Sequence, residues 1–176
     1  TPGRSDKNFG KAINDIVKLL PDEDWVCLRD IDTIPMNHEQ FFIQCEEIAK
    51  KNEYGLVGCM TNRLGLKWQL HKGEFSDEMD MMKHRQIGLE LTEKYGSDVN
   101  SSMNSIGGLF MMFPKSTWIK VGGFPEGSIM IKGRFIDYAF WESVRKKGIK
   151  VGIAKGIYLF HAYRIGKDKR DIKHLI

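Results

Sequence analysis

The chain has 176 residues, a length that fits one domain with a single hydrophobic core. Hydrophobic residues make up 41% of it and charged residues 28%, which is the balance of a globular protein, and no apolar run approaches the roughly 18 residues needed to cross a bilayer. The net charge of +4 is modest and the basic residues are spread out, which argues against nucleic acid as a partner.

Three cysteines, Cys27, Cys45 and Cys59, form an odd set without C-x-x-C spacing, and two of them lie in apolar runs. No secretory signal peptide is visible, so we expect reduced core thiols and a cytoplasmic protein. The basic tail from Arg164 to Lys173 leaves three interpretations open: a solvated tail, a contact with a diphosphate, or peripheral contact with an anionic membrane surface.

The first part of the chain predicts a helix followed by a β-α-β unit. In order, we expect a helix over about 8–20, a strand over 25–28, a helix over 37–51 and a strand over 55–60. Pro21 stops the first helix. Asp30 and Asp32 therefore stand at the carboxyl end of a short buried strand.

The rest of the chain continues the alternation. We expect an irregular segment over 61–75, helices from about 76 to 96, over 114–120 and over about 136–147, and strands over 107–113, near 150–154 and over 157–161. Ser76 is the expected cap of the first of these helices. The pattern predicts an α/β fold in three layers, with a mostly parallel mixed sheet flanked by helices.

Two carboxylates separated by one residue at a strand end are costly to place together, because their charges repel in a partly desolvated site. A hard cation such as Mg²⁺ or Mn²⁺ resolves the conflict, since it takes oxygen ligands and bridges to phosphate oxygens. Asp30 and Asp32 are thus candidate ligands of Mn²⁺ or Mg²⁺. The competing interpretation is a solvated turn, because turns favour Asp.

Four short stretches of the chain follow one another in the same order as the motifs of a known enzyme family. They are residues 8–14, residues 25–32 with Asp30-Ile31-Asp32, residues 107–113 with the glycine-rich turn 121–126, and residues 136–141 with Asp137. Through them the chain resembles the GT-A glycosyltransferases, especially inverting enzymes that use nucleotide-sugar donors. The resemblance implies a GT-A-like, Rossmann-like fold.

The chain departs from the family's pattern at two points. The family usually has an acidic pair before the late helix, whereas this sequence has Ile136-Asp137, so only Asp137 inherits the role of catalytic base. The opening β-α-β elements of a full GT-A domain are absent from these residues. We therefore expect residues 1–176 to be a single GT-A-like domain that is truncated at its amino end or reduced in size.

The resemblance implies a metal-dependent hexosyltransferase that moves a sugar from a UDP- or GDP-linked donor to a glycan, lipid-linked or other hydroxyl acceptor, with inversion. Asp30, Asp32 and His161 would hold the metal, and Asp137 would take the acceptor's proton. Two alternatives stay open. Asp137 can be an acid that favours a helix amino terminus, and His161 can be a simple hydrogen-bonding residue at a strand end.

Further residues are candidates for donor and acceptor contacts. The expected nucleotide-sugar-binding residues are Arg4, Lys7, Lys11, Arg29, Asp30, Ile31, Gly107, Gly108 and Arg164. Trp68 and Trp141 are candidates for an aromatic platform under an acceptor sugar, although Trp141 fits a core position equally well. Solvation at the surface is the alternative for each basic residue.

Two other functions compete with the transferase. Asp30-Ile31-Asp32-Thr33 also resembles the opening motif of haloacid-dehalogenase-type phosphatases, in which Asp30 would be a nucleophile, Asp32 the acid and base, and Mg²⁺ the cofactor. That family needs the motif on its first strand and a later acidic pair, whereas a helix precedes it here. A GT-A relative that binds a nucleotide or a partner without transferring sugar is the second alternative.

Overall fold

The computed structural model describes residues 8–127, 130–131 and 134–163. Within them the main sheet contains β1 (Trp25–Arg29), β2 (Thr33–Pro35), β3 (Leu56–Thr61), β4 (Val99–Ser101), β5 (Phe110–Pro114) and β8 (Val151–His161). The α-helices are α1 (Phe9–Lys18), α2 (His38–Lys51), α3 (Met81–Tyr95), α4 (Lys115–Val121) and α5 (Ile136–Lys146). Two 3-10 turns, η1 (Lys67–Gln69) and η2 (His71–Gly73), and a small hairpin of β6 (Met130–Ile131) and β7 (Arg134–Phe135) complete the fold.

The main sheet is mixed, and its strand order is β1-β5-β3-β8-β2 with β4 beside β8. The only parallel pair among the described strands is β3 with β8, so the prediction of a mostly parallel sheet is wrong. β1 and β3 do point the same way, as the helix between them requires. They are not neighbours, however, because β5 lies between them and is antiparallel to both.

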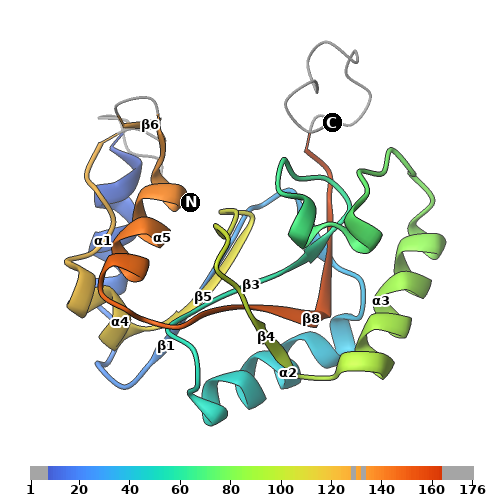
Figure 1. Ribbon diagram of the computed structural model, residues 1–176, viewed down its shortest axis with the longest axis horizontal. Helices are drawn as coiled ribbons and strands as arrows, with labels where there is room; N and C mark the ends of the chain where they lie inside the picture. The colour runs from blue at the N-terminus through green and yellow to red at the C-terminus, as the bar shows by residue number, and fades with distance from the viewer. Residues whose placement is uncertain (1–7, 128–129, 132–133, 164–176) are drawn as a thin grey trace.

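Helices cover both faces of the sheet, so the α/β class and the flanking helices are confirmed (Figure 1). Along β5, Phe110 and Met112 pack into one core with α2, while Met111 and Phe113 pack into another core with α1 and α5. This alternation is what a strand buried on both faces must show, because successive side chains point to opposite sides.

Strand β8 bends sharply in its middle, where Figure 1 shows the ribbon turn toward the C-terminus. Its first part pairs with β4 and its last part with β2. The register against β3 jumps there, because Cys59 pairs with Ala154 but the next residue, Met60, pairs with Tyr158. A Cβ on Gly156 would lie 2.0 Å from the Gly96 carbonyl oxygen, so the bend needs a glycine. The two final strands predicted from the sequence are therefore one bent strand.

The helix ends follow local hydrogen-bond chemistry. α1 begins after Asn8, whose side-chain oxygen accepts the Lys11 N–H at 3.0 Å. α3 begins at Met81 and not at Ser76 as predicted, because the Asp80 carboxylate is the group that accepts the Met82 N–H. In the part of the chain that the structure describes, no helix is both long enough and apolar enough to span a membrane.

Candidate metal centre

The ends of three strands meet at one edge of the sheet. β1, β3 and β8 point the same way, so the residues that follow each of them share that edge. Asp30 and Asp32 follow β1, Asn62 follows β3, and His161 is the last residue of β8. The resemblance to the GT-A family implies that the two aspartates and the histidine come together here.

The turn after β1 is held by hydrogen bonds that fix both aspartates. The Asp30 N–H donates to the Leu109 carbonyl at 3.0 Å, and the Asp30 carbonyl accepts from the Thr33 N–H and, at 2.7 Å, from the Thr33 hydroxyl. The guanidinium of Arg29 donates to the Thr33 carbonyl. The Asp32 carbonyl accepts the Ala162 N–H at 2.8 Å, which ties the turn to the end of β8.

Asp30, Asp32 and His161 each offer one ligand atom, and these atoms lie within 4.8 Å of one another. The Nε2 of His161 is 3.5 Å from the Asp32 carboxylate, and its Nδ1 is 2.8 Å from the Arg63 carbonyl oxygen. A carbonyl can only accept, so Nδ1 carries the proton and the lone pair of a neutral ring lies on Nε2.

This donor set fits a divalent cation. Two carboxylates with one imidazole nitrogen favour Mn²⁺ over Mg²⁺, because Mg²⁺ prefers oxygen ligands throughout. The hydrogen bond from Nδ1 to a backbone carbonyl is also the usual support of a metal-binding histidine.

The electrostatics at this edge favour a positive ion. Desolvation by the surrounding protein raises the pKa of Asp30 although the residue is exposed by surface area, and His161 lowers it. The nearby carboxylates of Asp32 and Asp137 raise it further. A cation beside Asp30 would remove the repulsion that these neighbours create.

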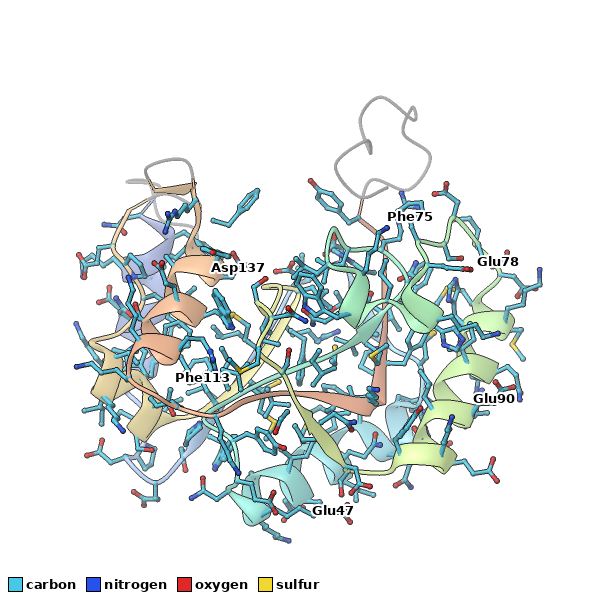
Figure 2. The ribbon with its side chains drawn as sticks, viewed as in Figure 1. Glu47, Phe75, Glu78, Glu90, Phe113 and Asp137 are labelled. Carbon is cyan, nitrogen blue, oxygen red and sulfur yellow. The ribbon has the colours of Figure 1, made fainter. Side chains whose placement is uncertain are left out.

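Asp137 lies at the start of α5 near this edge, and Figure 2 shows it across the middle of the molecule from Phe75. Its carboxylate accepts the Gly108 N–H at 2.6 Å and the Tyr138 N–H at 2.8 Å. Burial raises the pKa of Asp137, and these backbone hydrogen bonds oppose the change. The result is an oriented carboxylate that is more basic than an ordinary aspartate, which suits a general base.

Gly108 is required where it touches Asp137, and this gives a prediction. A Cβ at this position would lie 2.9 Å from Oδ2 and 3.0 Å from Cβ of Asp137. Gly108→Ala is expected to displace the carboxylate and to lower a rate that depends on it by about 10- to 100-fold, while the fold persists. The sugar-transfer rate that the family resemblance implies, followed as nucleotide release, and thermal unfolding measure the two effects. An unchanged rate would show that the position of Asp137 does not matter.

The expected donor-binding residues lie in different surroundings. Arg29 holds the aspartate turn, and Ile31 at its tip is 91% exposed. The Gly107 N–H already donates to the Gln69 side chain at 2.8 Å, and Lys11 forms an ion pair with Asp15 within α1. Arg4, Lys7 and Arg164, which are also predicted to contact the donor, lie outside the residues that the structure describes.

The two tryptophans differ from each other. Trp68 is partly exposed, and its indole N–H donates to the Ser105 carbonyl at 2.7 Å, which fixes the ring on the loop before β5. Trp141 is partly buried against the core formed with α1 and α5, and its ring lies 5.2 Å from that of Tyr138. Trp68 is thus the better placed of the two for contact with a ligand.

Sequence reasoning missed two residues beside the site. Asn62 and Arg63 fall in the segment predicted to be an irregular surface loop, yet they are 1% and 2% exposed. Their polar side chains give no hydropathy signal of burial. The only sequence clue is that Asn62 follows directly on an apolar strand whose carboxyl end faces the aspartates.

Two shallow surface pockets lie elsewhere, around Tyr54. Tyr54 precedes β3, so these pockets are at the opposite edge of the sheet from Asp30. Neither pocket is lined by the aspartates, by His161 or by Asp137. These two pockets therefore do not locate the site, and the convergence of ligand atoms does.

Comparison of the chain with protein-family models, with curated proteins and with solved structures gives no match. The architecture establishes an α/β fold with a mixed open sheet flanked by helices. The function must be argued from the site itself.

Proposed function

We propose that the chain is a metal-dependent glycosyltransferase of the GT-A type, which moves a hexose from a UDP- or GDP-linked donor to an acceptor hydroxyl with inversion. The observation that carries the proposal is the meeting of Asp30, Asp32 and His161 at one edge of the sheet. A fourth group, Asp137, lies close enough to Asp30 to raise its pKa. A metal site with an oriented base beside it is what such a transfer needs.

In the proposed mechanism, Asp30, Asp32 and His161 would hold Mn²⁺, and the bound cation would supply positive charge for the diphosphate leaving group. Asp137 accepts the proton of the acceptor hydroxyl. At the same time the hydroxyl oxygen attacks the anomeric carbon of the donor sugar, and the bond from that carbon to the diphosphate breaks. The Gly108 and Tyr138 N–H groups keep the Asp137 carboxylate oriented. One displacement gives one inversion.

Binding of a nucleotide diphosphate should depend on the metal. Calorimetry with UDP and with GDP is expected to show binding that is at least about 10-fold tighter with Mn²⁺ than with a chelator, because the three grouped side chains would hold a cation that bridges to the phosphates. Asp30→Asn combined with Asp32→Asn should abolish the difference. Asp98→Asn, which alters an exposed aspartate paired with Lys51, is the matched control and should retain it.

Three results would redirect the proposal. Binding that ignores Mn²⁺ would remove the metal centre. Metal-dependent binding without nucleotide release from any UDP- or GDP-hexose would favour a binding protein over an enzyme. Hydrolysis of an aryl phosphate that Asp30→Asn abolishes would favour the phosphatase chemistry, in which Asp30 is a nucleophile.

A further inference from the structure

The last residue of β8 is held by the two residues that follow β3. The regular ladder between these strands ends at the pair Thr61 and Leu159. Beyond it, the Asn62 side chain takes over the pairing, since its Oδ1 accepts the His161 N–H at 2.7 Å. Its amide nitrogen lies 3.5 Å from the His161 carbonyl oxygen, a longer contact. A buried side chain thus replaces the next backbone partner and fixes where the histidine stands.

The backbone carbonyl of Arg63 fixes the His161 ring, and the Arg63 side chain is anchored by three contacts. Nε donates to the Tyr163 carbonyl at 3.0 Å, the guanidinium pairs with the Asp77 carboxylate, and it lies over the Phe75 ring at 4.8 Å. A buried guanidinium is costly unless it is paired in this way. The anchored side chain therefore holds the carbonyl in its place against the Nδ1 of His161.

We propose that Asn62 and Arg63 are positioning residues for the metal centre, because together they hold His161 as the Nδ1–H tautomer with Nε2 turned toward Asp32. The expected effect on metal affinity rests on the proposed function. The tautomer of His161 does not, because it is set by contacts within the chain. Supporting groups of this kind change metal affinity by about 10- to 100-fold when they are removed.

Two readouts test the proposal. In nitrogen-15 NMR spectra, the His161 ring of the metal-free wild type is expected to be in the Nδ1–H form, and Asn62→Ala and Arg63→Met should convert it to a mixture of tautomers. Mn²⁺ alone, titrated into the same proteins, should bind these variants about 10- to 100-fold more weakly than wild type. Asn62→Asp keeps an oxygen for the His161 N–H and should keep the tautomer. Asn100→Ala, an exposed change in β4, should alter neither readout.

The outcomes separate this inference from the proposed function. A wild type that binds no Mn²⁺ would overturn the metal centre, while the tautomer still tests the positioning role. A wild type that binds Mn²⁺, with variants of equal affinity and unchanged tautomer, would overturn the positioning role alone. If Asn62→Ala does not fold, Asn62→Asp and Arg63→Met test the positioning role in its place. A His161 ring in the Nε2–H form in the folded Asn62→Asp protein would count against the proposal.

A second observation, independent of the metal centre, concerns two thiols on the other side of the sheet. Cys27 pairs with Met112, and Met112 pairs with Val57, so the three residues form a row on one face. That face packs against α2, which carries Cys45. The Cys27 and Cys45 thiols therefore lie on facing elements, close enough for each to shift the pKa of the other. Because β1 is an edge strand, Cys27 is exposed, and the expectation that it is a core thiol is wrong.

We propose that Cys27 and Cys45 form a reversible disulfide when the protein meets a hydroperoxide. The Cys27 thiolate attacks one peroxide oxygen, the O–O bond breaks, and the other oxygen leaves as water or an alcohol after taking a proton. The sulfur of Cys45 then attacks the sulfenic acid on Cys27 and releases water. Two electrons pass from the two thiols to the peroxide.

The surroundings assign the attacking thiol. The hydrogen bond from Cys45 lowers the pKa of Cys27, burial opposes the change, and the charge of Arg29 lowers it as well. The same hydrogen bond, together with burial, raises the pKa of Cys45. Burial raises the pKa of Cys59, so this third thiol stays protonated. Cys27 is thus the nucleophile and Cys45 the resolving group.

Treatment of the full chain with hydrogen peroxide tests this proposal. The thiols titrated after denaturation should fall from three to one, with a Cys27–Cys45 link in peptide maps and full recovery on reduction. Cys59→Ser, the matched control, should still form the link. Cys45→Ser should leave a sulfenic acid on Cys27 that dimedone traps. Three thiols after oxidation, or a wild-type Cys27 that is oxidised without a link to Cys45, would overturn the proposal, and neither result depends on a variant that folds.

Discussion

Asp137→Asn is expected to lower the rate of nucleotide release from a UDP- or GDP-hexose by about 10²- to 10⁴-fold, the usual contribution of a general base. The amide cannot take a proton, but it has almost the same shape as the carboxylate. The affinity for the nucleotide diphosphate with Mn²⁺ should stay the same, because Asp137 is not among the three grouped ligands. Steady-state release and calorimetry on the same preparation measure the two quantities.

The substitution also has a structural cost that must be measured beside the rate. The two carboxylate oxygens of Asp137 accept N–H groups from Gly108 and Tyr138, and an amide leaves one of these donors without its acceptor. That loss costs about 1–3 kcal/mol, too little to unfold a typical domain. Glu142→Gln is the control, because Glu142 lies on the same helix as Asp137 and forms a surface ion pair with Arg134 of β7. Equal losses of rate and of nucleotide affinity would make Asp137 a structural residue.

The strand pattern of the sequence predicts where Asp30, Asp32 and His161 stand along the chain, and the family resemblance is what groups them into one site. A helix between two strands makes β1 and β3 point the same way, and the pattern alone shows Asp30 following one strand and His161 ending another. It cannot show which strands are neighbours. All the residues from Phe110 to Phe113 are buried, and a fully buried strand looks the same in parallel and antiparallel pairing. The place of β5 was therefore not predictable.

The other differences also come from contacts between distant parts of the chain. Gly156 reads as a break between two strands, because nothing local indicates that the Gly96 carbonyl approaches it. Arg63 reads as a surface residue, because its partner Asp77 is fourteen positions away along the chain. Cys27 reads as buried, because its strand is apolar and only the strand order places it at an edge.

A second large effect, on stability, is expected from Asn14, because this residue supports α5. Asn14 on α1 is 5% exposed and joins three groups: its oxygen accepts the Phe124 N–H at 2.8 Å and the Trp118 indole N–H at 2.9 Å, and its nitrogen donates to the Phe124 carbonyl at 2.9 Å. Phe124 in turn stacks on Phe140 of α5, with ring centres 4.0 Å apart. Asn14 thus links α1 and α4 to the helix that begins near Asp137.

Asn14→Ala is expected to lower the free energy of unfolding by about 2–4 kcal/mol, because two buried backbone groups and a partly buried indole N–H lose their partner at once. In a chain of this size each kcal/mol corresponds to about 2–4 °C in Tm. Lys18→Ala, at an exposed position of the same helix, is the control and should change stability by less than about 0.5 kcal/mol. Urea denaturation measures both. A loss in Asn14→Ala no larger than in the control would mean that water replaces the side chain and that α5 does not depend on Asn14.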